Sequence, residues 1–116
     1  MKKILLVEND PGLNDAVTCV LQSSGFDVIQ SRVNQTVEQI HQIDPQLILL
    51  NNAMNTRPGD EVCLEIKNHP LTKHIPVILT TLMTKYESVA DNTCADDFII
   101  MPFNIADMEQ KIRCYI

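Results

Sequence analysis

Five short, almost continuous apolar segments restrict what this sequence can fold into more than any other feature. They lie at residues 3–7, 27–30, 46–50, 76–81 and 97–101. Apolar and polar residues alternate in a strand with one face in water, whereas an unbroken apolar run is typical of a strand covered on both faces. The segments therefore predict a buried parallel sheet.

The stretches between these strands have helical spacing, and the first is the clearest. Its apolar residues step by three and four positions along one face: Leu13, Ala16, Val17, Val20 and Leu21. Asp10 is placed to cap the start of this helix, and Gly25 follows its end. The pattern predicts an amphipathic helix that covers the sheet.

Four further helices are expected, and each is marked by a few apolar positions. These are Val33, Val37 and Ile40 for the second, Val62, Cys63 and Ile66 for the third, residues 85–91 for the weakest, and Ile105, Met108 and Ile112 for the last. Asn104 is placed to cap the last helix. Strands that alternate with helices through short connections imply right-handed crossovers and a doubly wound α/β domain with helices on both faces of the sheet.

Length and charge limit the class of protein. A chain of 116 residues can bury one core without disulfides or metals, so residues 1–116 are read as one domain. No apolar run approaches the roughly eighteen residues of a membrane span, and the apolar start is too short for a secretory signal, so a cytoplasmic protein is expected. Fifteen acids against nine bases, a net charge of −6, oppose direct binding of nucleic acid by this domain.

The four cysteines are scattered along the chain at positions 19, 63, 94 and 114, without a C-x-x-C pair. Three of them lie within apolar helical patterns. We therefore expect reduced cysteines that act as small hydrophobic residues of the core.

Polar residues follow the predicted strands. Glu8, Asn9 and Asp10 come after the first, Asn51 and Asn52 after the third, and Thr80 and Thr81 close the fourth. Because the carboxyl ends of parallel strands meet at one edge of the sheet, we expect these side chains to converge there, where ligands bind in open α/β sheets.

Several motifs resemble the receiver domains of bacterial response regulators. Residues 3–11 are similar to the family's opening I-L-L-V-E-D-D-P, and residues 44–50 to the P-D-L-I-L-L that precedes its phospho-accepting aspartate. Residues 51–63 match the spacing D-x-x-x-P-G-x-D-G-x-E-V-C without a gap, and residues 94–103 resemble G-A-D-D-Y-x-x-K-P-F, with Cys94 at the position of the glycine. The resemblance covers the whole chain and implies a flavodoxin-like fold with strand order 2-1-3-4-5.

The residues that carry the family's chemistry are replaced here. The resemblance puts Asn51 at the phospho-acceptor position, Glu8, Asn9 and Asp10 in the acid pocket, and Met101 at the lysine position. An uncharged carboxamide cannot form the acyl phosphate that a carboxylate nucleophile forms. With Glu8 the one acid kept of the family's three, no metal site or cofactor is expected, and Mg²⁺ binding at Glu8 should be weak.

Met101 agrees with this interpretation. A lysine whose carboxylate partner has been removed would leave a buried unpaired ammonium, which costs several kcal/mol. The replacements involve charges of both signs, which favours an alternative design over a single altered position. The chain is therefore interpreted as a pseudo-receiver with no enzymatic activity.

The leading functional hypothesis is a regulatory module of a two-component pathway that acts by protein contact without phosphorylation. The resemblance implies a protein partner or a homodimer through the face of the fourth helix, fifth strand and fifth helix, near Leu82, Met83 and Tyr86, and switch positions at Thr81 and Phe98. Plain core or helix packing explains the same residues as well. Two alternatives stay open: phosphorylation of a displaced acid, Asp10 or Asp60, and the regulatory half of a DNA-binding transcription factor that continues past Ile116.

Overall fold

Five parallel strands form the centre of the computed structural model, which describes residues 1–82 and 94–116. They are β1 (Lys3–Val7), β2 (Asp27–Ser31), β3 (Leu47–Asn51), β4 (Val77–Leu82) and β5 (Asp97–Met101). In the sheet they follow the order β2-β1-β3-β4-β5, and every neighbouring pair is parallel. The strand order implied by the sequence is confirmed, and the observed strands begin and end within one residue of the predicted segments.

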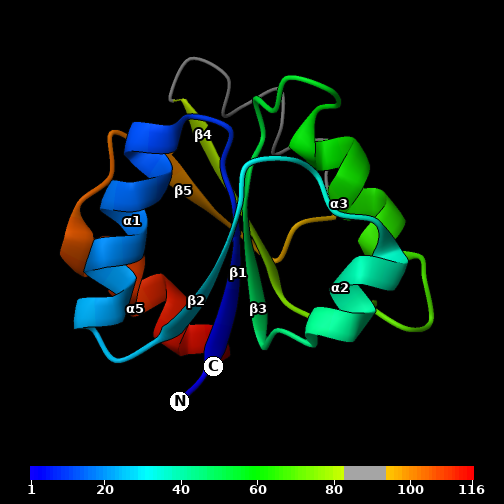
Figure 1. Cartoon of the computed structure of the whole chain (residues 1–116), viewed down its shortest axis with the longest axis horizontal. Coiled ribbons are helices and arrows are strands. Elements are labelled where there is room, and N and C mark those ends of the chain that lie inside the picture. Colours follow the sequence, from blue (N-terminus) through cyan, green and yellow to red (C-terminus); the bar gives the residue numbers. More distant parts are fainter. Residues whose placement is uncertain (83–93) are drawn as a thin grey trace.

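Two layers of helices enclose this sheet (Figure 1). α1 (Pro11–Ser23) and α5 (Ile105–Tyr115) cover one face, and α2 (Val37–Ile43) and α3 (Gly59–Lys67) cover the other. The predicted helix at residues 85–91 lies outside the described residues. Among the described residues, no helix is both long and apolar enough to cross a membrane.

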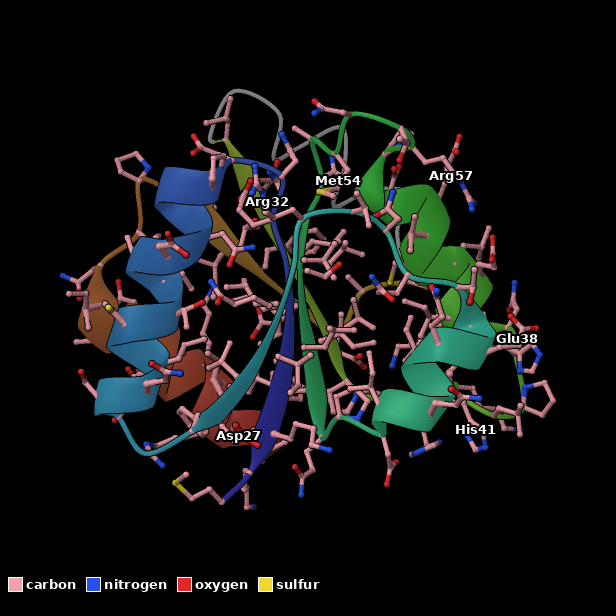
Figure 2. All side chains as sticks on the ribbon, in the orientation of Figure 1. Asp27, Arg32, Glu38, His41, Met54 and Arg57 are labelled. Carbon is pink, nitrogen blue, oxygen red and sulfur yellow. The ribbon has the colours of Figure 1, made fainter. Side chains whose placement is uncertain are left out.

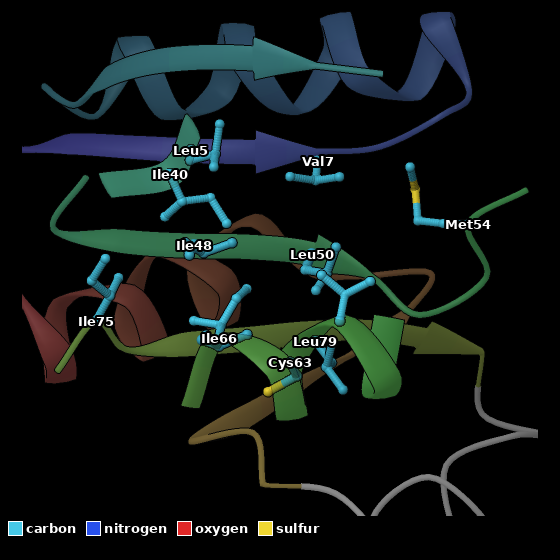
Figure 3. Close-up of a cluster of buried hydrophobic side chains, with 12 residues drawn as sticks. Leu5, Val7, Ile40, Ile48, Leu50, Met54, Cys63, Ile66, Ile75 and Leu79 are labelled. Atoms are coloured by element: carbon cyan, nitrogen blue, oxygen red, sulfur yellow. The ribbon is translucent and has the colours of Figure 1, made fainter. Parts of the chain in front are cut away.

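The sheet separates two clusters of buried side chains, one on each face. Leu5 and Val7 of β1 pack with Ile40 of α2 and Ile66 of α3, as Figure 3 shows. Ile4 and Leu6 point to the opposite face, where α1 and α5 supply Val17, Leu21, Met108 and Ile112. Since successive side chains of a strand point to opposite faces and both faces are covered, the strands are apolar without a break.

The helices begin where side chains satisfy their first backbone N–H groups. The predicted caps are confirmed: Asp10 Oδ1 accepts from the N–H groups of Gly12 and Leu13, and Asn104 accepts from those of Ala106 and Asp107. α2 begins with a capping box in which Thr36 and Gln39 bond to each other's backbone N–H.

Three apolar residues do not lie where the sequence pattern placed them. Val33 precedes α2 and is exposed, because the capping box starts the helix at Val37. Ile105 in the first turn of α5 is exposed, and so is Ala16 on α1. For each of these three helices, the spacing of apolar residues predicted one buried residue that the structure shows to be exposed.

The polar surface and the chain ends complete the arrangement. Glu38 and His41 on α2 and Arg57 ahead of α3 project away from the sheet (Figure 2). The two chain ends lie together at the end of the sheet where the strands begin (Figure 1), and Lys2 Nζ donates a hydrogen bond to the carbonyl of Ile116. The carboxyl ends of the strands are therefore at the far side of the molecule from both ends of the chain.

Candidate functional site

A cavity of about 250 Å³ lies at the carboxyl ends of the central strands. It is lined by Glu8, Leu13, Asn51, Asn52, Ala53, Thr80, Thr81, Leu82 and Met101. Residues that follow β1, close β3 and β4 and end β5 thus meet, as the parallel arrangement predicts. Asn51 lies in register with Thr80 of the neighbouring strand.

Among residues 1–82 and 94–116, Glu8 is the one carboxylate that lines this cavity, and it is only 4% exposed. Its Oε2 accepts a hydrogen bond from Asn51 Nδ2 at 2.9 Å and another from the backbone N–H of Asp10 at 3.1 Å. Hydrogen bonds to the ionised form stabilise a buried carboxylate. Two neutral N–H donors thus face the carboxylate of Glu8.

Asn51 is fixed at both ends of its amide. While Nδ2 donates to Glu8, Oδ1 accepts from the backbone N–H of Ala53 at 2.9 Å. The amide therefore points its donor at Glu8 and its acceptor at its own loop. A carboxylate at this position would have no hydrogen to offer to Glu8.

The N-terminus of α3 packs directly on the backbone that carries Asn51. A Cβ atom added at Gly59 would lie 2.7 Å from the carbonyl oxygen of Asn51 and 2.8 Å from Cα of Asn52. Gly59 N–H also donates to the carbonyl of Asn52 at 2.8 Å, and Asn52 Oδ1 accepts from Asp60 N–H at 3.0 Å. Asn52 thus caps a helix whose preceding Pro58 offers no side-chain cap.

Asn14 supports the site from α1, and the sequence interpretation missed it. It is 1% exposed, and its Nδ2 donates to the carbonyls of Glu8 at 3.0 Å and Ser31 at 3.1 Å. The signal was present, since a polar residue three positions before Val17 and seven before Leu21 lies on the apolar stripe of a helix. Asn14 joins the ends of β1 and β2 beside the cavity.

The other acid-pocket positions have different roles. Asn9 Nδ2 donates to Asn55 Oδ1 at 3.4 Å, and Asn9 Oδ1 is shielded from solvent without a donor among the described residues. The carboxylate of Asp10 caps α1. Asp60 is half-buried in the first turn of α3, where its Oδ1 accepts from Glu61 N–H at 3.0 Å. Neither Asp10 nor Asp60 lines the cavity.

The two switch positions lie toward the core. Thr81 is buried, and its hydroxyl donates to the carbonyl of Leu82 at 3.4 Å. Phe98 is half-buried and packs against the cluster under α2 and α3. Leu82, at the end of β4, is 55% exposed. Met83 and Tyr86, also expected at a partner face, lie outside the described residues.

The residues of this cavity do not fit a divalent cation. Mg²⁺ takes an octahedron of oxygen ligands and is held in proteins mainly by carboxylates. The described lining of the cavity offers one carboxylate, Glu8, and the NH₂ group of Asn51 faces it at 2.9 Å. Across residues 1–82 and 94–116, no group of three or more histidine, cysteine, aspartate or glutamate residues could hold a metal ion.

Comparison with known proteins agrees with the motifs and the fold. The model of the response regulator receiver domain matches residues 4–113. The chain is 27% identical over 119 aligned residues to the DNA-binding dual master transcriptional regulator RpaA of Synechocystis, covering 100% of this chain and 49% of that protein. It is 28% identical over 115 residues to the phosphate regulon transcriptional regulatory protein PhoB of Escherichia coli, covering 97% of this chain and 50% of that protein. The chain thus spans about half the length of these relatives.

Solved structures share the fold. A putative response regulator from Chloroflexus aurantiacus superposes with a TM-score of 0.90 at 20% identity, covering 98% of this chain and 96% of that chain. The chemotaxis response regulator CheY4 of Vibrio cholerae superposes with a TM-score of 0.82 at 17% identity, covering 100% and 99%. Similarity at identities this low indicates a common architecture. The chemistry of the cavity is inferred from the residues that line it in this chain.

Proposed function

The chain belongs to the response regulator receiver domain family, and from this premise we propose that it is a two-component signalling module that acts by protein contact without being phosphorylated. The observation that carries the proposal is the hydrogen bond from Asn51 Nδ2 to Glu8 Oε2. The amide at the acceptor position donates a hydrogen bond to the acid beside it, so a neutral side chain is paired with the carboxylate of Glu8. No free nucleophile faces the cavity at residue 51.

The chemistry of the amide supports the same conclusion. Acyl phosphate formation needs an oxygen nucleophile that carries negative charge, and an amide oxygen carries none. A cation that would neutralise the incoming phosphoryl group has one carboxylate among the described residues that line the cavity, and the position at the end of β5 holds the uncharged Met101. The nucleophile and the charges that would assist it are thus missing together.

The proposed output is a contact surface beside the cavity. Leu82 is exposed at the carboxyl end of β4. β4 pairs with β5 there, and α5 follows β5 along the chain. We place a protein partner or a second copy of the chain on the face of β5 and α5 that the resemblance implies, the remainder of that face lying outside the described residues. In this proposal Thr81 and Phe98 couple the cavity to that face through packing.

Incubation with acetyl phosphate and Mg²⁺, followed by intact mass measurement, tests the proposal. The wild-type chain should show no increment of one phosphoryl group. The matched positive control is the triple variant Asn9→Asp/Asn51→Asp/Met101→Lys, which restores the family's residues and should gain a labile phosphoryl group. A phosphoryl group on wild-type residue 51 would overturn the proposal. Loss of an increment on changing Asp10 or Asp60 to alanine would instead identify a displaced acceptor.

A second candidate function is favoured by the relatives. RpaA is described as DNA-binding and PhoB as a transcriptional regulatory protein, and each is about twice the length of this chain. The domain would then be the regulatory part of a transcription factor. Reading the gene past the codon for Ile116 tests this candidate, because a DNA-binding domain in the same frame would support it and a stop codon would contradict it.

A further inference from the structure

Two cysteine thiols meet on the α3 side of the sheet, far apart in sequence. Cys63 Sγ on α3 lies 3.7 Å from Cys94 Sγ, just ahead of β5, and the two residues are 31 positions apart. Both are free thiols. A disulfide has an S–S bond of about 2.05 Å, so each sulfur would need to move by roughly 0.8 Å. Side-chain rotation and small backbone shifts supply movements of this size.

Neighbouring contacts hold the two segments together. Lys67, one turn after Cys63, forms an ion pair with Asp96 at 2.6 Å, and its Nζ also donates to the carbonyl of Ile75 at 2.7 Å. Asp96 Oδ2 in turn accepts from the N–H of Val77 at 2.8 Å, while Asp96 N–H donates to the carbonyl of Val77 at 2.9 Å. These contacts join α3, the start of β4 and the residues just before β5 beside the thiols. They hold the two sulfur atoms close to each other.

The two thiols differ in access. Cys63 has no exposed surface and belongs to the cluster of Figure 3, whereas Cys94 is partly exposed and packs against that cluster. Burial raises the pKa of the Cys63 thiol, and the adjacent Cys94 and Asp96 raise it further, while Lys67 opposes them. Cys63 is therefore protonated at neutral pH and shielded from solutes. An external oxidant reaches Cys94 first.

Core packing alone is a weaker explanation of this pair. The sequence pattern led us to expect all four cysteines in the core, yet Cys19 on α1 and Cys114 on α5 are exposed. In the resembling motif a glycine stands at the position of Cys94, so a side chain is not needed there to fill space. The feature that distinguishes a cysteine at this position is the second sulfur, Cys63 Sγ, at 3.7 Å.

We propose that Cys63 and Cys94 form a reversible disulfide site that covalently joins α3 to the start of β5. The oxidant is a low-molecular-weight disulfide. The Cys94 thiolate attacks one of its sulfurs, forming a mixed disulfide and releasing one thiol. Cys63 then loses its proton and attacks Cys94 Sγ, releasing the second thiol. Two protein thiols and one small disulfide thus become one protein disulfide and two small thiols.

The experiment uses the full chain in a Cys19→Ser/Cys114→Ser background, which removes the two exposed thiols. The folded protein is incubated with glutathione disulfide, its remaining thiols are blocked by alkylation in denaturant, and intact mass and linked peptides are measured. The expected product is lighter by two hydrogens, with the Cys63 and Cys94 peptides joined and the bond reversed by dithiothreitol. Its thermal midpoint should rise by on the order of 5–15 °C, because the link restricts the unfolded chain.

Single substitutions separate the two chemical steps. Cys63→Ser should stop at a persistent glutathione adduct on Cys94, and Cys94→Ser should leave Cys63 unmodified. Cys63→Ala gives the same readout should serine prove too polar for the core. Formation of the disulfide itself is measured in protein that keeps both Cys63 and Cys94. The proposal is overturned if, in protein that stays folded by circular dichroism, Cys63 remains a free thiol while Cys94 carries glutathione or neither reacts. It is likewise overturned if the disulfide formed joins two molecules.

This site is independent of the function proposed above. Disulfide formation is read by mass and peptide mapping in protein that has met no phosphodonor. Failure to form the link would leave the interpretation of Asn51 untouched. Phosphorylation of the wild-type cavity would likewise leave the thiol pair untouched.

Discussion

Charged groups near the two ends of α3 have different partners: a neutral amide at the N-terminal end and an opposite charge at the C-terminal end. At its N-terminus, Gly59 packs on the backbone of Asn51, whose amide serves as a neutral partner for the buried Glu8. At its C-terminus, Lys67 pairs with Asp96 at 2.6 Å, with side chains 16% and 33% exposed. Burial alone therefore does not decide whether a charge is kept, since Glu8 is the most buried of these three acids and bases. Lys67 keeps its charge beside an opposite charge, Glu8 keeps its carboxylate beside neutral donors, and the uncharged Met101 lines the same cavity as Glu8.

The largest expected effect breaks the packing at the N-terminal end. Gly59→Ala should lower the free energy of unfolding by about 3 kcal/mol, because the new methyl group meets backbone atoms that cannot rotate away. Urea denaturation measures this difference. Gly12→Ala is the matched control, since a Cβ there would lie 3.5 Å from Asp10 Oδ1, an ordinary contact distance. Equal effects of the two substitutions would contradict the close approach at Gly59.

The second prediction turns the neutral partner into a charged one. Asn51→Asp should lower stability at neutral pH by about 2 kcal/mol, because a carboxylate replaces the donor that lies 2.9 Å from Glu8 Oε2. Repulsion disfavours two ionised carboxylates in the folded state, so the variant binds more protons when folded than when unfolded. Its deficit relative to wild type therefore grows with rising pH and shrinks as pH falls toward about 4. Thermal unfolding across this pH range checks the sign.

A double-mutant cycle sharpens the same comparison. Adding Met101→Lys to Asn51→Asp should recover about 1 kcal/mol, because the ammonium regains a carboxylate partner across the cavity. Met101→Lys alone should give no such gain. Additive effects of the two substitutions would show that residues 51 and 101 do not interact.

The smallest effect belongs to the C-terminal end. Lys67→Met should lower stability by about 1 kcal/mol, because the pair with Asp96 is partly exposed and Asp96 keeps the N–H of Val77 as a donor. Arg57→Met is the control, since its pairs with Glu61 and Glu65 are about half exposed and should contribute little. Guanidinium denaturation with both variants measures the contrast. A Lys67→Met variant as stable as the Arg57→Met variant would remove the distinction between the two ends of the helix.

The architecture could be predicted from sequence because its signals are local. Continuous apolar strands, the caps Asp10 and Asn104, and the gapless motif around Asn51 depend on residues close together in the chain. The convergence of Glu8, Asn51, Thr81 and Met101 followed from the parallel sheet. The contact between Asn51 and Glu8 did not follow, because the amide's orientation depends on Ala53 N–H as well.

Features that depend on the exact rotation of a helix escaped prediction. Asn14 faces inward to bind two strand-end carbonyls, whereas Ala16 and Cys19 of the same helix face solvent. The contact of Cys63 with Cys94 joins residues 31 positions apart and depends on how α3 lies across β4 and β5. Spacing along the chain gives the period of a helix but gives its phase only to within about one residue.

The bond between Lys2 and the carbonyl of Ile116 has a practical consequence. Because residues 1 and 116 lie at the same end of the sheet, an affinity tag, biotin or fluorescent reporter attached at either residue would lie at the opposite end of the sheet from the cavity. A sensor chip or bead coated through these fusions would display the other end of the sheet, where Leu82 lines the cavity, to the partner in solution. Swapping the attachment between the two ends should therefore leave measured association rates unchanged.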